Sequence, residues 1–291
     1  MTLTATPLTP AIGAELSGID FAKPISAAVG DALYEALIAH KVVFMRGQDV
    51  APAAHMALAE ALGKVDAPHP VYPAVEGFPS MVCLDTSDNN PPDTDVWHAD
   101  LTFRAQPPFA SILRAVHLPP SGGDTIWADM YAAVERMDPH LRAECEGLRA
   151  VHDMGNFRNA FTEGADGSAE KLSQAMAKLG CAVRPIIDIS PVTGKPFLNV
   201  NEGFTTYVCG LSRRASDRLL QRLFALVEHP EIQVRFRWSP GAIAIWDNRV
   251  TQHYAVADYM PERRIMHRVT VIEDTRASAQ TPPDTLAEAA A

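Results

Sequence analysis

His98 and Asp100 are the side chains of this sequence best suited, by type and spacing, to bind a metal ion together. On a β-strand, side chains two residues apart point to the same face, so we expect both to reach one cation while Ala99 points away. An imidazole and a carboxylate suit Fe(II), Mn(II) or Zn(II). The pattern also occurs by chance, so the prediction of a metal site requires a third ligand.

His253 is the candidate third ligand. It follows an apolar strand predicted at 242–246 and a polar run at 247–249, which places it near a sheet end where a pocket can open. Taken singly, it is more simply explained as a core histidine. Together, the two histidines and one carboxylate leave coordination positions open, as a redox iron needs for a chelating co-substrate and O₂. A structural zinc site is more often closed by four protein ligands.

Two arginines share one face of a predicted strand at 264–271. Arg264 and Arg268 alternate with apolar residues, and their spacing corresponds to roughly 13 Å along an ideal strand. If that face is buried, the two guanidinium groups require anions, and each suits a carboxylate or a sulfonate. The alternative is a solvated edge strand with ordinary surface charges.

The composition excludes several classes of protein. The chain has 291 residues and a formal net charge of −10, which argues against nucleic acid or an anionic membrane as partner. No apolar run approaches the length of a membrane span, and the N-terminus lacks the features of a secretory signal. The four cysteines are widely spaced and suggest neither disulfides nor a thiolate zinc site, so we expect a cytoplasmic protein.

The predicted elements indicate a mainly β protein of the α+β class. Short β-branched strands, expected at 81–85, 110–116, 183–189, 196–200, 232–238, 242–246 and 264–271, are interrupted by helices near 131–148, 168–179 and 212–228. Helices at 26–40 and 53–62 flank a strand at 41–46. This pattern favours a jelly roll (a double-stranded β-helix) with helices outside over a doubly wound fold. We expect a single domain over residues 1–275 and a flexible tail over 276–291.

Several stretches resemble the taurine/2-oxoglutarate dioxygenase family over nearly the whole chain. They are HPVYP (69–73), DNNPPDTDVWHAD (88–100), SGGDT (121–125), FLNVNEGFTT (197–206) and IWDNRVTQHYAVADYMPERRIMHRVTV (245–271). The resemblance implies an Fe(II) centre, 2-oxoglutarate and O₂ as co-substrates, and a homodimer or tetramer. It also implies hydroxylation of taurine next to its sulfonate, which releases sulfite and aminoacetaldehyde together with succinate and CO₂.

The same resemblance assigns roles to individual residues. It implies that His98, Asp100 and His253 bind the iron, and that Arg264, assisted by Thr125, binds the distal carboxylate of 2-oxoglutarate. Arg268 matches the arginine that faces the substrate sulfonate. The other residues expected to line the substrate pocket are His69, Tyr72, Phe204 and, with its register left open, Phe161.

Two positions depart from the family pattern. Thr94 stands where an asparagine that contacts the taurine amine is expected, and Leu101 stands where a valine beside the sulfonate is expected. The first leaves only a hydroxyl, and the second adds a methylene to the pocket. Three alternatives therefore stay open: a dioxygenase for another alkylsulfonate or an alkyl sulfate ester, a non-catalytic anion-binding jelly roll, and a zinc hydrolase. The last lacks an evident general base.

Overall fold

The largest element is a sheet with the strand order β1-β2-β3-β15-β7-β17-β6-β5, to which β4 is joined through β17. The computed structural model describes residues 3–69, 72–88, 90–92, 95–155, 173–174, 177 and 179–280. The strands of this long sheet are β1 (Thr4–Pro7), β2 (Ala14–Ser17), β3 (Val42–Met45), β4 (Lys64–Val65), β5 (Ala74–Val75), β6 (Phe78–Thr86), β7 (Ala110–His117), β15 (Ile243–Asp247) and β17 (Arg264–Glu273).

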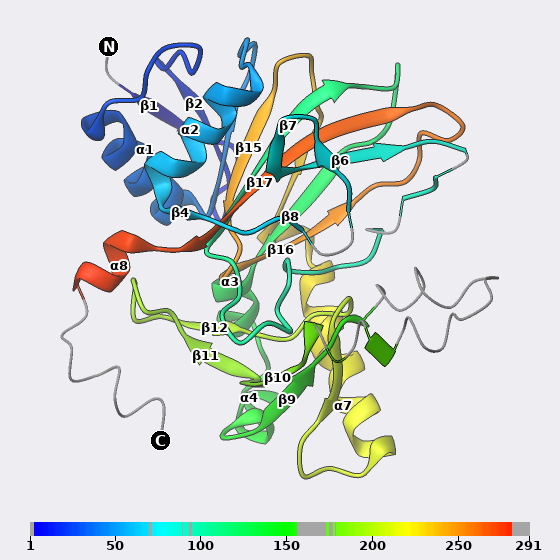
Figure 1. The fold of residues 1–291 in the computed structure, drawn as a ribbon. Coiled ribbons are helices and arrows are strands. Elements are labelled where there is room, and N and C mark those ends of the chain that lie inside the picture. The colour runs from blue at the N-terminus through cyan, green and yellow to red at the C-terminus, as the bar shows by residue number, and fades with distance from the viewer. Residues whose placement is uncertain are drawn as a thin grey trace.

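Two helices, α1 (Ala27–His40) and α2 (Pro52–Leu62), cover one face of the long sheet (Figure 1). Ser26 caps α1 by accepting a hydrogen bond from the Val29 amide at 3.3 Å, as predicted from the sequence. Their leucines pack against apolar side chains of β7, β15 and β17 in one buried cluster. This layer leaves the opposite face of the sheet available for the site.

A second sheet packs against that opposite face. Its strand order is β14-β8-β16, with β14 (Gln233–Phe236), β8 (Thr125–Asp129) and β16 (Thr251–Ala255). Trp127 and Phe236 from this sheet form a cluster with Phe44, Trp246 and Met266 from the long sheet. The two sheets therefore enclose an inner layer of side chains, and the chain is mainly strands with helices outside.

Most of the remaining elements lie at the end of the molecule away from α1 and α2 (Figure 1). They are α3 (Met130–Glu135), α4 (Pro139–Cys145), β9 (Arg149–His152), β10 (Ala182–Pro185), β11 (Ile187–Ile189), β12 (Pro196–Leu198), β13 (Thr205–Val208), α7 (Arg213–Phe224), η2 (Ala225–Glu228) and η3 (Pro230–Ile232). All of them except β10 contribute side chains to a second apolar core.

Several predicted boundaries differ from the structure for local reasons. The strand expected at 183–189 is two strands in different sheets, because Ile186 changes partner: its amide donates to the Leu148 carbonyl and its carbonyl accepts from the Asn199 amide. The helix expected at 131–148 is two helices, since Asp138 caps a new helix that begins at Pro139. At the start of the predicted tail, α8 (Thr275–Gln280) forms, and residues 281–291 lie outside the described part.

No helix within the described residues combines the length and the apolar character needed to cross a membrane. The four cysteines, all in the described part of the chain, are free thiols.

Candidate metal centre

The structure brings His98, Asp100 and His253 together, with one ligand atom from each lying within 4.8 Å of the others. All three side chains are buried. The backbones of His98 and His253 exchange two hydrogen bonds, at 3.1 and 2.8 Å, so the two imidazoles lie side by side with ring centroids 4.1 Å apart. The three side chains therefore form a group that could hold one metal ion.

Asp100 reaches this group for a different reason from the one predicted. Residues 97–100 do not form a strand; His98 makes an isolated bridge, and a turn begins at Asp100. Leu101 has a φ of 54°, an uncommon conformation for a leucine. The turn, rather than strand alternation, brings the carboxylate to the histidines. His253 likewise lies in the middle of β16 and not, as was predicted, near a sheet end.

A hydrogen bond to the backbone fixes which nitrogen of the His98 ring can bind a metal. Its Nδ1 lies 2.8 Å from the Val96 carbonyl oxygen, which can only accept, so Nδ1 carries the proton. Nε2 is then the nitrogen with a lone pair, and it lies 3.9 Å from Oδ1 of Asp100. In metal-binding histidines, a hydrogen bond from the ring nitrogen that does not bind the metal commonly fixes the tautomer.

The electrostatics of the group suit a cation. Burial alone would raise the pKa of Asp100, but the nearby Arg268 guanidinium and the two histidines lower it below its usual range, so the carboxylate is ionised. Burial, followed by the proximity of His98, lowers the pKa of His253 well below its usual value. A neutral imidazole and an ionised carboxylate are the forms that bind metal.

Arg264 meets the requirement for binding an anionic co-substrate. Its side chain is buried, and its Nε and Nη2 atoms have no hydrogen-bond partner among the described residues. Its guanidinium carbon lies 6.0 Å from the ring centroid of Trp238, whose Nε1 donates to Oγ1 of Thr125 at 3.0 Å. A buried cation with unused donors is costly unless an anion pairs with it, and a carboxylate supplies the matching geometry.

Arg268 lies on the same buried face of β17 but has a partner. Its Nη1 donates to Oδ1 of Asp100 at 2.7 Å, while its Nε has no partner among the described residues. The sequence placed Arg268 near a substrate anion and did not foresee this contact with a metal ligand. The alternating face of β17, with Arg264, Met266, Arg268 and Thr270 buried, is as predicted, and the exposed edge-strand alternative is wrong.

The other expected pocket residues lie together, because Tyr72 packs against the apolar cluster that contains Leu101 and Phe204. His69 stacks on Tyr72 with ring centroids 4.8 Å apart, and burial followed by the charge of Arg268 lowers the pKa of His69 to about 3. Leu101 and Phe204 belong to an apolar cluster with Phe103 and Met154, and the Phe204 ring lies 6.1 Å from that of His98. Thr94 and Phe161 lie outside the described residues.

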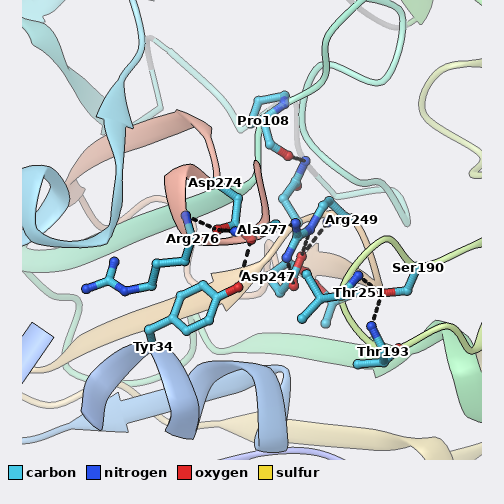
Figure 2. Close-up of polar contacts among 12 residues, drawn as sticks. Tyr34, Pro108, Ser190, Thr193, Asp247, Arg249, Thr251, Asp274, Arg276 and Ala277 are labelled. Atoms are coloured by element: carbon cyan, nitrogen blue, oxygen red, sulfur yellow. Dashed lines mark hydrogen bonds and ion pairs between the residues drawn. The ribbon is translucent and has the colours of Figure 1, made fainter. Parts of the chain in front are cut away.

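A buried ionic network supports the turn that carries Asn248. Arg249 donates twice to Asp247, at 2.9 and 2.7 Å, and once to Asp274 at 2.9 Å (Figure 2). Asp274 also accepts from the Tyr34 hydroxyl at 3.0 Å. This network ties the turn after β15 to α1 and to the start of α8.

Asn248 holds the backbone of Asp100 on both sides. Its Oδ1 accepts from the Asp100 amide at 2.7 Å, and its Nδ2 donates to the Asp100 carbonyl at 2.9 Å. Ser111 contacts the carboxylate itself, since its hydroxyl donates to Oδ2 at 3.0 Å. Neither side chain was predicted from the sequence to contact Asp100; the only signal for Ser111 was one small polar residue in an apolar strand.

Comparisons with known proteins agree with this geometry. The sequence profile described as "Taurine catabolism dioxygenase TauD, TfdA family" matches residues 4–270. An alpha-ketoglutarate-dependent sulfate ester dioxygenase of Pseudomonas putida is 36% identical over 270 residues, which cover 91% of this chain and 88% of that protein. An alkylsulfatase of Acinetobacter baylyi is 34% identical over 279 residues, covering 94% and 86%. The crystal structure of a taurine dioxygenase from Burkholderia xenovorans superposes with a TM-score of 0.78 at 32% identity, covering 94% and 90%.

Proposed function

Since the chain belongs to the TauD, TfdA family and is a 2-oxoglutarate-dependent dioxygenase, we propose that it hydroxylates an alkyl sulfate ester or an alkylsulfonate at the carbon that bears the sulfo group. The observation that carries the proposal is the pair of buried arginines, Arg264 and Arg268, on one face of β17, with Arg268 in contact with the candidate metal ligand Asp100.

Different residues are proposed to bind the metal and the two anions, 2-oxoglutarate and the sulfate or sulfonate substrate. In our proposal, His98, Asp100 and His253 bind Fe(II), and the unused donors of Arg264, with Thr125, bind the distal carboxylate of 2-oxoglutarate. The iron and the keto acid would supply the oxidising chemistry, in which one oxygen atom of O₂ enters succinate and the other enters the substrate. The protein would orient 2-oxoglutarate and the substrate, and it would exclude water from the layer between the sheets.

Arg268 is proposed to bind the sulfo group and thereby to choose the carbon that reacts. Its Nε is available for a sulfo oxygen while Nη1 contacts Asp100, so the anion would be fixed relative to the metal ligand. Orientation of this kind matters, because a displacement of about 1 Å can cost on the order of a hundredfold in rate. His69 and Tyr72 would lie on the same side.

The apolar cluster beside His98 favours an alkyl chain over an ammonium group. Leu101, Phe103 and Phe204 offer carbon surface without a hydrogen-bond acceptor, Met154 offers only a weak one, and Tyr72 packs against this cluster. The names of the Pseudomonas putida and Acinetobacter baylyi relatives point to sulfate esters. We therefore place an alkyl sulfate ester first, and taurine, which the Burkholderia xenovorans protein's name suggests, second.

Each substrate gives a different inorganic product. Replacing a C–H bond by C–OH on the carbon of a sulfate ester yields a species that collapses to an aldehyde and sulfate. The same step on taurine yields aminoacetaldehyde and sulfite. In both cases one 2-oxoglutarate and one O₂ are consumed, and one succinate and one CO₂ are formed.

We further propose that the two packed sheets are the halves of a double-stranded β-helix in a single domain over residues 1–275. The assembly as a homodimer or tetramer and the cytoplasmic location stay predictions.

The test is a substrate panel. The purified protein is loaded anaerobically with Fe(II) and 2-oxoglutarate, and then mixed with oxygenated buffer containing taurine, longer alkylsulfonates or linear alkyl sulfates. We expect oxygen consumption matched by succinate and by sulfate from the esters. Release of sulfite from taurine at a higher kcat/KM would reverse the order of the two substrates. A protein that binds these anions but consumes no oxygen would instead be the non-catalytic binding protein.

A further inference from the structure

We propose that Ser111 is a positioning residue, which turns the Asp100 carboxylate so that only Oδ1 faces the metal. The inference rests on the proposed metal site and concerns a residue that neither the metal ligands nor the co-substrate contacts include. It would determine how many coordination positions remain open.

Ser111 lies where its side chain has little freedom. It is fully buried in β7, where it pairs with Trp246 on β15 and with Thr270 on β17. Strands on both sides thus fix its backbone, and its hydroxyl donates to Oδ2 of Asp100 at 3.0 Å. Ser111 is therefore a donor at a fixed place, and it points at a residue that comes from a turn.

The other contacts of Asp100 leave the carboxylate orientation to Ser111 and Arg268. Asn248 fixes the backbone of Asp100 through its amide and carbonyl groups. Arg268 contacts Oδ1, the oxygen that also lies 3.9 Å from Nε2 of His98. Because the Ser111 hydroxyl holds Oδ2, rotation that would bring both oxygens to one cation breaks a buried hydrogen bond.

The number of open positions gives this contact a chemical consequence. Two histidines and one carboxylate oxygen leave three positions of an octahedral ion free, enough for a bidentate keto acid and O₂. A carboxylate that binds through both oxygens would take one of the three. Hydrogen bonds to ligating carboxylates commonly tune metal affinity, and losing one typically weakens it by about ten- to a hundredfold.

The alternative is that Ser111 only satisfies a buried hydroxyl and contributes to folding. Ser216 offers a matched control, because it is also fully buried and makes one side-chain hydrogen bond, accepting from the Val208 amide at 2.8 Å. It lies on α7, whose buried leucines belong to the second apolar core. A purely structural role predicts the same behaviour for Ser111→Ala and Ser216→Ala.

The experiment measures metal binding without turnover. Metal-free wild type, Ser111→Ala and Ser216→Ala are titrated with Mn(II) by calorimetry, and their Co(II) complexes are compared by visible absorption, which reports coordination number. We expect the Mn(II) dissociation constant of Ser111→Ala to rise by about tenfold or more. Its Co(II) spectrum should also change, whereas Ser216→Ala should match the wild type in both measurements.

The outcomes separate this inference from the proposed function. A Ser111→Ala protein with the wild-type dissociation constant and the wild-type Co(II) spectrum would overturn the positioning role and leave the metal site standing. Equal changes in both serine variants would show a general folding effect and also overturn it. A wild-type protein that binds neither metal would remove the proposed function itself.

Discussion

The two sides of the candidate site are built differently. On one side, Thr125, His253, Arg264 and Arg268 belong to β8, β16 and β17, where neighbouring strands hold each residue in register. On the other side, His69, Tyr72 and Leu101 lie in turns and connecting segments, held by local stacking and an apolar cluster. The proposed reaction therefore depends on the strand side together with His98 and Asp100, whereas the choice of alkyl chain depends on the loop side.

Removal of a metal ligand should have the largest effect. We expect His98→Ala or Asp100→Ala to lower succinate formation by at least about a thousandfold, which corresponds to about 4 kcal/mol of transition-state stabilisation. His140→Ala, an exposed histidine on α4, is the control and should behave as the wild type. Substantial turnover in either ligand variant would refute the metal assignment on which the comparison depends.

Arg264→Met should have a smaller effect, and it should weaken the binding of 2-oxoglutarate while stabilising the ligand-free protein. The KM for 2-oxoglutarate should rise by about ten- to a hundredfold, because one charge-assisted, bidentate contact is lost. The ligand-free protein should become more stable, with a melting temperature higher by about 2 °C or more, since an unpaired buried cation is replaced by an apolar side chain.

Arg263→Met is the matched control for this prediction, because Arg263 is the exposed neighbour that pairs with Asp85. It should leave the KM for 2-oxoglutarate unchanged. A rise in KM of the same size in both variants, or a lower melting temperature for Arg264→Met, would count against a co-substrate role for Arg264.

Leu101→Ala tests the loop side and should have the smallest effect. We expect the ratio of kcat/KM values for long and short alkyl sulfates to change by about tenfold, with the KM for 2-oxoglutarate unaltered, because pocket changes of this size are worth about 1–3 kcal/mol. Leu141→Ala removes a similarly buried leucine from α4 and should leave the ratio unchanged. A Leu101→Ala protein with the wild-type ratio would show that this loop does not select the chain.

The sequence predicted the strand side better than the turns. Alternation along 264–271 correctly predicted the buried face of β17, since period two is a property of every strand. The same rule, applied to 97–100, predicted that His98 and Asp100 lie together, which is correct, but for a wrong reason, because Asp100 is brought in by a turn. A sharp turn produces no periodic pattern in the sequence. Leu101 has a positive φ, a conformation for which glycine or asparagine is the usual residue, so its type did not indicate the turn.

Contacts between segments far apart in the chain could not be predicted from the sequence. Ser111 and Asn248 hold Asp100 through pairings that depend on the register of β7 and on a turn fixed by the network around Arg249. The pairing of Arg268 with Asp100 likewise depends on where the turn at Asp100 meets β17. Residue types predicted what these side chains can bind, but only the assembled sheets determine which partner each one meets.

The most direct test of the account is a crystal structure of the protein with Mn(II) and an inert 2-oxoglutarate analogue, in which anomalous scattering locates the metal. We predict one metal peak between His98, Oδ1 of Asp100 and His253, with the analogue's distal carboxylate on Arg264. A metal peak elsewhere, or an analogue whose distal carboxylate does not contact Arg264, would contradict the account.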